Sequence, residues 1–249
     1  MKVSVALGQL RSEYCNLAKN CERHIEWADR AYKRGARIII FPELSLSGYY
    51  LREAVSEVAL LPGSPVLHRL ITMNKIGIIA GFVEKGEKRR FYNSALLCED
   101  GELIGIYRKT YLPTYGMFEE GRYFSPGRAL KTYRMSWGTI GVVICEDAWY
   151  PQFVLQYASL NIDVLVVLTA SPVKGISPES GIKNSEINRA IMKLYARNLQ
   201  IPVIFVNKVG YEHGIYFWGG SAVYKPGGAV HCTASVYSEE LVITYINVN

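Results

Sequence analysis

The sequence is poor in the residues that build metal sites and disulfide frameworks. Its 249 residues include only four histidines and five cysteines. The histidines show no H-x-x-x-H or similar ligand spacing, and the cysteines form no C-x-x-C pair. An odd number of cysteines, with no secretory signal peptide, is typical of proteins kept in a reducing compartment. We therefore expect a cytoplasmic protein without a bound metal.

Several other signatures are missing. No Walker or dinucleotide-binding glycine pattern occurs, so we expect no cofactor. No apolar run approaches the roughly 20 residues that span a bilayer, so we expect a soluble protein that does not enter the membrane. The G-x-S-x-G elbow of serine hydrolases is absent too, because the serines of LSLSG lack the first glycine.

The surplus of positive charge is small and scattered. Lysine and arginine number 28 against 22 acidic residues, which gives a net charge of +6. The densest basic cluster is predicted to lie at an exposed hairpin tip and consists of Lys85, Lys88, Arg89 and Arg90. A nucleic-acid interface needs a clustered basic face, so we expect no nucleic-acid partner.

Apolar residues are abundant, at 49% of the chain, and their patterning predicts one α/β domain over residues 1–249. Strand, helix, strand, helix and strand are followed by a meander, and the same alternation then returns. Two similar halves of this kind, each a sheet with helices on one side, predict a four-layer α-β-β-α sandwich. Helices are expected at 17–34, 64–74, 151–160 and 185–198, and the main strands at 2–10, 37–41, 76–83, 91–98, 103–108, 130–135, 139–144, 164–168 and 203–207.

The first predicted helix has Asn16 as its N-cap and an apolar face at helical spacing. We expect that face to enter the core; its members are Leu17, Cys21, Ile25, Ala28 and Tyr32. His24 lies on or near the same face, which favours a packed histidine over a catalytic one.

Three buried strands are each followed by a residue that can take part in catalysis. Glu43 follows the second strand, Lys109 follows the 103–108 strand and Cys145 follows the 139–144 strand. Taken singly, each has an ordinary explanation as a turn carboxylate, a surface lysine or a small core thiol. Because ligands of α/β sheets bind beyond the strand ends, the three together predict a nucleophile, a base and a stabilising cation.

Three segments resemble the three motifs of the nitrilase (carbon–nitrogen hydrolase) superfamily, in the same order: FPELSLSGY, RKTYLPTYGMFEEGRYF and GVVICEDAW. The resemblance implies the four-layer fold. It also implies that Cys145 is the nucleophile, that Glu43 is the general base, and that Lys109 and the backbone N–H after Cys145 stabilise the oxyanion. Glu120 would orient Lys109 and the substrate amide, with Glu119 as the neighbouring alternative.

Four further segments are similar to the glutaminase domain of glutamine-dependent NAD synthetases: CEDAW, LPTYG, TASP and NKVG. This resemblance implies that the substrate pocket is shaped by Tyr49, Tyr115, Glu146 and Ser171, and Trp149 would help to form an aromatic entrance. Those relatives carry an ATP-using synthetase domain, and nothing similar occurs before Asn249. We therefore expect a free-standing amidase or a subunit that works with a separate synthetase.

The expected function is that of a cofactor-free thiol amidohydrolase acting on a small linear amide, with glutamine as a candidate. A nitrilase or an N-carbamoyl-amide hydrolase with the same triad is the alternative among enzymes. A non-catalytic binding or scaffold protein is the alternative of another class. The presence of Glu43, Lys109 and Cys145 together argues against that last alternative.

We also expect a homodimer or a higher homo-oligomer. The predicted helix 151–160 follows the Cys145 turn directly, and the superfamily resemblance implies pairing through this region. The expectation depends on three apolar side chains of the helix being exposed, namely Phe153, Leu155 and Tyr157.

Overall fold

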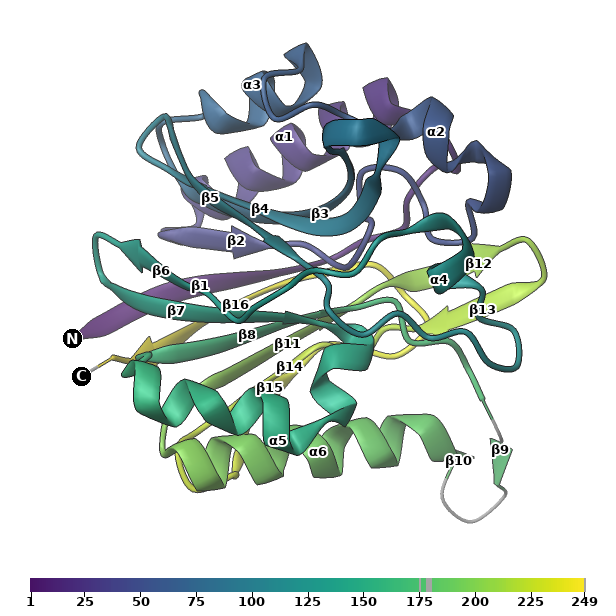
Figure 1. Ribbon diagram of the computed structural model, residues 1–249. Coiled ribbons are helices and arrows are strands. Elements are labelled where there is room, and N and C mark those ends of the chain that lie inside the picture. The colour runs from purple at the N-terminus through teal and green to yellow at the C-terminus, as the bar shows by residue number, and fades with distance from the viewer. Residues whose placement is uncertain (175, 178–180, 249) are drawn as a thin grey trace.

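The computed structural model describes residues 1–174, 176, 177 and 181–248. Two six-stranded mixed sheets pack face to face, and helices cover their outer faces (Figure 1). The strand order is β16-β1-β2-β3-β4-β5 in the first sheet and β15-β14-β11-β8-β7-β6 in the second. The predicted four-layer α-β-β-α sandwich is therefore confirmed.

The first half of the chain forms most of the first sheet. Strands β1 to β3 run parallel to one another, and β4 and β5 continue the sheet as an antiparallel meander. The elements are β1 (Lys2–Gln9), α1 (Leu17–Lys33), β2 (Ile38–Ile40), α2 (Val55–Val58), α3 (Pro65–Ile71), β3 (Gly77–Lys85), β4 (Phe91–Glu99), β5 (Glu102–Arg108) and α4 (Glu120–Tyr123).

The second half repeats the plan, with β7, β8 and β11 as its parallel strands. Strand β16 then returns to the first sheet and pairs antiparallel with β1. The elements are β6 (Thr132–Met135), β7 (Gly138–Ile144), α5 (Pro151–Val154), β8 (Val164–Thr169), β9 (Ile176–Ser177), β10 (Gly181–Ile182), α6 (Lys183–Leu199), β11 (Val203–Asn207), β12 (Val209–Glu212), β13 (Ile215–Trp218), β14 (Ala222–Tyr224), β15 (Val230–Thr233) and β16 (Glu240–Asn247). The predicted loop 169–183 holds β9 and β10, and its residues 175 and 178–180 lie outside the described residues.

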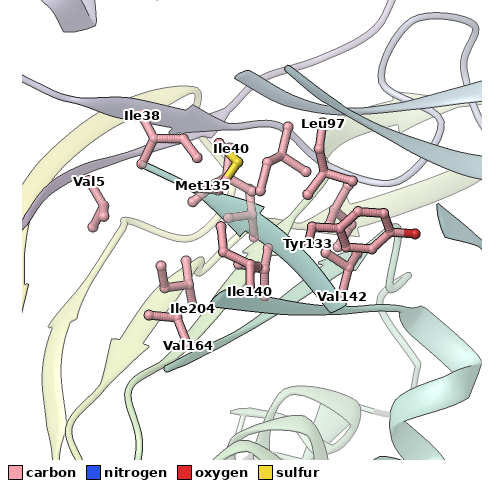
Figure 2. Close-up of a cluster of buried hydrophobic side chains, with 14 of the residues drawn as sticks. Val5, Ile38, Ile40, Leu97, Tyr133, Met135, Ile140, Val142, Val164 and Ile204 are labelled. Atoms are coloured by element: carbon pink, nitrogen blue, oxygen red, sulfur yellow. The ribbon is translucent and has the colours of Figure 1, made fainter. Parts of the chain in front are cut away.

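The core between the sheets is built from alternate residues of the strands. Because side chains of a strand point to opposite faces in turn, every second residue of a fully apolar strand reaches the partner sheet. Figure 2 shows this interface, in which Ile38 and Ile40 of the first sheet face Ile140 and Ile204 of the second. The intervening residues, such as Ile39 in β2 and Val143 in β7, pack against the helices instead.

Helix α1 begins as predicted, because the Asn16 side chain accepts a hydrogen bond from the N–H of Lys19. Its expected apolar face was partly wrong, since Tyr32 is 45% exposed. The buried face includes Asn20 and His24, whose side chains reach Leu46 O and Ser45 Oγ at 2.9 Å each. A pattern of apolar residues cannot detect buried polar positions, so the predicted buried face of the helix was rotated away from the observed one. His24 is packed in the core, as predicted.

The helix after the Cys145 turn corrects a second expectation. Phe153 and Tyr157 are buried against the second sheet rather than exposed, and Leu155 is partly buried. The Tyr157 hydroxyl donates to Val142 O at 2.9 Å, which fixes the ring against β7. The side chains invoked for pairing are therefore largely used inside the subunit. The homo-oligomer stays a prediction.

Two expectations about the surface can be compared with the structure. The basic cluster at residues 85–90 is exposed at the tip of the β3–β4 hairpin, as predicted. Within residues 1–174, 176, 177 and 181–248, no helix combines the length and the apolar character that crossing a membrane requires.

Candidate active site

The three strand-end residues meet at the end of the sandwich that carries α4 and the β12–β13 hairpin, away from both termini (Figure 1). Glu43 and Lys109 come from the first sheet, and Cys145 comes from the second. The site therefore lies where the two sheets meet rather than along the edge of one sheet.

Glu43 is held in a fully buried position just beyond β2. The turn that carries it crosses tightly over β3, where a Cβ on Gly81 would lie 2.3 Å from Leu44 N. Only glycine allows this approach. One carboxylate oxygen of Glu43 contacts Lys109 Nζ at 2.6 Å, and the other accepts the N–H of Ala170 at 2.8 Å. Glu43 thus joins both sheets.

Lys109 is fully buried beyond β5, and its ammonium bridges two carboxylates. Its Nζ lies 2.6 Å from Glu43 Oε1 and 2.7 Å from Glu120 Oε1. Its backbone is fixed on both sides, because its N–H donates to Asn93 O and its carbonyl accepts from Gly127. Two acids and one base in a dry site carry a formal net charge of −1.

Glu120, rather than Glu119, faces the site. Glu120 begins α4, is 6% exposed, and accepts a hydrogen bond from the Tyr49 hydroxyl at 2.7 Å. The Glu119 side chain is 37% exposed and pairs with Arg52 and Arg122 at the surface. The geometry therefore favours Glu120 as the second carboxylate of the site.

Cys145 sits at the junction of β7 and the 3₁₀ turn Cys145–Trp149, with φ at 46°. This left-handed conformation is costly for a non-glycine residue, and strained residues of this kind occur at functional sites as well as in tight turns. Asp147 fixes the turn, since its Oδ2 accepts the N–H of Ile144 at 3.0 Å. Its Oδ1 accepts the N–H groups of Thr110 and Tyr111, so the Cys145 turn is tied to the segment after Lys109.

A cavity of about 370 Å³ opens beside Cys145. Glu146, Tyr115 and Ser171 line it as expected, and Trp149 borders it as well. The Tyr115 hydroxyl lies 3.0 Å from both oxygens of Glu146. Tyr49 is an exception among the expected pocket residues, because it is buried behind Glu120 and is not among the residues that line this cavity.

The carbon–nitrogen hydrolase family model matches residues 4–249, nearly the whole chain. The chain belongs to this family. It is an enzyme family, and the Cys145 cavity and the carboxylate–lysine cluster lie within the matched region.

Three relatives show the range of proteins similar to this carbon–nitrogen hydrolase. A glutamine-dependent NAD(+) synthetase of Acinetobacter baylyi is 32% identical over 242 residues, covering 95% of this chain and 43% of that protein. An N-carbamoylputrescine amidase of Solanum lycopersicum is 28% identical, covering 88% and 78%. The solved structure of an Acinetobacter baumannii NAD+ synthetase superposes with a TM-score of 0.89 at 30% identity, covering 99% of this chain and 46% of that one. The chain thus spans less than half the length of the NAD synthetases it matches.

The charges of the site act on the Cys145 thiol in opposite directions. Burial and the carboxylate of Glu43 raise its pKa well above the usual value, and the Lys109 ammonium opposes them. The expectation that Lys109 lowers the thiol pKa is therefore right in direction but is outweighed. In general, a thiol whose pKa is raised needs an adjacent base before it can act as a thiolate nucleophile.

Burial also raises the pKa of Glu120, to about 7, although Lys109 beside it acts in the opposite direction. For Lys109, burial favours the neutral amine, but Glu120 and Glu43 together raise its pKa well above normal. The ammonium therefore stays charged at neutral pH. A permanent cation between two carboxylates is suited to stabilise a developing oxyanion.

Sequence reasoning assigned no role to four residues at the site. Asn93 donates to Glu43 Oε1 at 2.8 Å and lies 3.4 Å from Glu120 Oε2, so it holds both carboxylates. Asp147 accepts the N–H groups of Thr110 and Tyr111 and so ties the Cys145 turn to the segment after Lys109. Lys174 and Lys183 line the cavity and supply positive charge beside Glu146. The only signal for Asn93 was a polar residue in an apolar strand, and Asp147 follows the cysteine closely.

Within the described residues, no cluster of three or more His, Cys, Asp or Glu side chains could hold a metal.

Replacing Glu120 with glutamine is expected to lower kcat by at least about 10²-fold, because a neutral amide cannot balance the charge of Lys109 and accepts hydrogen bonds more weakly than a carboxylate. Glu119→Gln is the matched control and should change kcat less than about threefold, since its carboxylate faces solvent. Steady-state ammonia release measures both. The opposite ranking would show that the wrong glutamate has been placed in the site.

Proposed function

We propose that this carbon–nitrogen hydrolase is a cofactor-free thiol amidohydrolase that releases ammonia from the side-chain amide of a small zwitterion such as glutamine. The observation that carries the proposal is the buried Glu43–Lys109–Glu120 cluster next to Cys145, with a cavity that offers both signs of charge. Its volume of about 370 Å³ lies within the range of small-molecule pockets, about 300–1,000 Å³.

In the first half of the proposed reaction, Glu43 takes the proton of the Cys145 thiol and the thiolate attacks the amide carbon. The carbonyl oxygen becomes an oxyanion, which Lys109 and the backbone N–H of Glu146 stabilise. Glu43 then passes its proton to the amide nitrogen. The C–N bond breaks, ammonia leaves, and a thioester remains on Cys145.

In the second half, Glu43 takes a proton from a water molecule, which attacks the thioester carbon. The C–S bond breaks, the thiol is restored with the proton from Glu43, and the carboxylic acid leaves. The same group serves as base and acid in both halves, which is why a carboxylate at the centre of the site is needed. A free thiol is also needed, and we propose a reducing cytoplasm as its location.

The cavity supports a zwitterionic substrate. Glu146 is buried except where it lines the cavity, and its carboxylate suits an ammonium group there. Lys174 lies over the rings of Tyr115 and Phe118, with its Nζ 5.7 and 5.1 Å from their centroids, and Lys183 lines the same cavity. These cations suit a carboxylate at the outer end. A plain aliphatic amide would use neither charge.

A separate synthetase that receives the ammonia is the proposed partner, together with a homo-oligomeric assembly of the hydrolase itself. Support for the synthetase comes from the NAD synthetase relatives, in which the region matching this chain is less than half of the protein.

A panel of substrates tests the proposal by ammonia release. We expect glutamine to exceed the matching nitrile, in which C≡N replaces the side-chain amide, by at least about tenfold in kcat/KM. A nitrile has no N–H to donate to the two carboxylates, and each unpaired buried acceptor costs about 1–3 kcal/mol. A nitrile or an N-carbamoyl amine preferred by tenfold or more would overturn the amidase assignment.

Matched variants test the zwitterion separately. Glu146→Gln and Lys174→Met should each raise KM for glutamine by at least about tenfold, the effect of losing one charged contact of about 1.5 kcal/mol. Neither should change KM for butyramide, which has no charged head group. Equal effects on both substrates would refute the charge-recognition part of the proposal.

A further inference from the structure

A buried ion pair in the second half has no part in the mechanism above. Lys208 follows β11 and Glu212 ends β12, and the Lys208 Nζ lies 3.0 Å from Glu212 Oε2. The two side chains are 3% and 4% exposed. Burying two charges is costly even when they are paired, so a pair kept at such a position calls for a specific explanation.

The second carboxylate oxygen of Glu212 accepts hydrogen bonds from the loop after Glu43. Glu212 Oε1 accepts the backbone N–H of Tyr49 at 2.8 Å and that of Tyr50 at 2.5 Å. The loop comes close at Gly48, which has φ at +92° and where an added Cβ would lie 3.1 Å from Glu212 Oε2. The Glu212 carboxylate is thus the hydrogen-bond acceptor of two consecutive backbone N–H groups in this loop.

The segment held in this way reaches the reacting groups. The Tyr49 hydroxyl donates to Glu120 Oε1, the same oxygen that contacts Lys109 Nζ. The Tyr49 ring also packs edge-on against Phe217 of β13, with the centroids 5.7 Å apart. The β12–β13 hairpin therefore contacts both the backbone and the ring of Tyr49, and the Lys208 Nζ lies 5.5 Å from the Phe217 ring.

The opposite side of the hairpin contacts the wall of the substrate cavity. The N–H of Val173 donates to Tyr216 O at 2.6 Å, and Pro172 pairs with Phe217. These residues follow Ser171, which lines the cavity. The hairpin is therefore packed between the Tyr49 loop and the pocket segment, and its own placement is fixed by Lys208, whose N–H donates to Thr169 O at 3.0 Å.

We propose that Lys208 and Glu212 are a positioning pair that sets the Tyr49 hydroxyl against Glu120 for the amidase reaction. The inference rests on the proposed function. Glu212 accepts the two backbone N–H groups, and Lys208 places an opposite charge 3.0 Å from its other oxygen in a dry site. Burial lowers the pKa of Lys208 and Glu212 opposes that change, which is the behaviour expected of such a compensating partner.

A double-mutant cycle tests the connection. Tyr49→Phe removes the hydroxyl that donates to Glu120. Glu212→Gln weakens the hydrogen bond from the Tyr49 backbone N–H. Each should lower kcat for glutamine by about 10- to 100-fold, because a small displacement of a catalytic group has effects of this size. KM should stay within about threefold, since neither residue lines the cavity. In the double mutant the loss should be within about threefold of the worse single, and multiplying losses would overturn the proposal.

The neutral exchange Lys208→Gln/Glu212→Gln guards against simple misfolding. Each single substitution leaves one charge buried without its counter-charge, whereas the exchange removes both charges together. The two amides can form one hydrogen bond to each other, and the amide oxygen of the glutamine introduced at position 212 can still accept the two N–H groups, although more weakly than a carboxylate. The exchange should therefore recover at least about tenfold of the kcat that Lys208→Met loses. No recovery would overturn the pairing. Glu99→Gln is the matched control, a buried carboxylate that accepts a backbone N–H from Ser136 at 2.7 Å, and it should leave kcat unchanged.

A measurement without turnover separates this inference from the proposed function. Hydrogen exchange of the Tyr49 and Tyr50 amides in the Cys145→Ala protein should be at least about tenfold faster with Glu212→Gln, because their charged acceptor is weakened. Unchanged exchange would overturn the positioning role even if amidase activity is present. If the exchange is faster but the wild-type protein with intact Cys145 hydrolyses no amide, the contact is supported and the proposed function is contradicted instead.

Discussion

Replacing Cys145 with alanine is expected to abolish turnover and leave the fold intact. The proposed reaction passes through a bond to Cys145 Sγ, and removal of a covalent nucleophile costs on the order of 10⁴- to 10⁶-fold in kcat. Folding should tolerate the change, because alanine and cysteine share the same strain at φ 46° and the residue as a whole is only partly buried. Ammonia release and thermal unfolding measure the two effects.

The covalent intermediate gives a second, independent readout. Intact-mass measurement of the wild-type protein with a slowly hydrolysed amide should show one acyl group, and peptide mapping should place it on Cys145. Cys145→Ala should show no adduct. Activity of Cys145→Ala within tenfold of wild type would rule out the thioester mechanism.

Cys15 offers a matched control for this experiment. It is also a free, partly buried cysteine with a positive φ, at 53°, but it lies outside the residues that line the cavity. Cys15→Ala should keep kcat within about twofold and should still form the adduct. Because the two positions share exposure and backbone strain, a difference between them isolates the chemistry of Cys145.

The strand-end residues could be found from the sequence because each follows an apolar run that leaves little doubt about the strand. A carboxylate, an ammonium and a thiol placed just beyond such runs must lie at sheet ends, and the family motifs then separate them from ordinary turn residues. The layers of the fold followed from the same runs. A strand that is buried on both faces is a continuous apolar run, so it can be recognised without an alternation of polar and apolar residues.

The supporting contacts were hidden because they join segments far apart in the sequence. Glu43 meets the N–H of Ala170, and Asp147 meets Tyr107, across the interface between two sheets. No local pattern encodes those pairs. The exposed face assigned to Phe153 and Tyr157 failed for a related reason: a short helix with apolar residues on several sides gives no sign of which side meets the sheet.

Buried polar and charged side chains were the other gap. Asn20 and His24 face the core on α1, and Lys208 is buried beside Glu212, although all are residue types that sequence patterns seldom assign to the core. Asn20 and His24 have hydrogen-bond partners, and Lys208 has a partner of opposite charge, and the fold brings each partner close. Residues that break the hydrophobic pattern therefore mark the neighbourhood of the site better than those that obey it.

Glu43→Gln and Lys109→Met are each expected to lower kcat by at least about 10³-fold, and their double mutant should be within about tenfold of the worse single. Glutamine at position 43 cannot take the thiol proton. Methionine at position 109 removes the oxyanion partner and leaves the carboxylates of Glu43 and Glu120 facing each other without a cation. One of them must then bind a proton, because two like charges in a dry site raise each other's pKa. Losing the lysine therefore also weakens the base.

The control for these variants is Arg108→Met, which removes the neighbouring cation. Arg108 pairs with Glu84 on the outer side of β5, with its Nε 2.8 Å from Glu84 Oε2, and its side chain is 42% exposed. Its loss should change kcat less than about threefold, since its guanidinium pairs with Glu84 and with none of Glu43, Glu120 or Cys145. Thermal unfolding of all four proteins checks that the fold survives. If the losses of Glu43→Gln and Lys109→Met multiply in the double mutant, the two residues act independently, and the single proton-transfer unit proposed for this site does not exist.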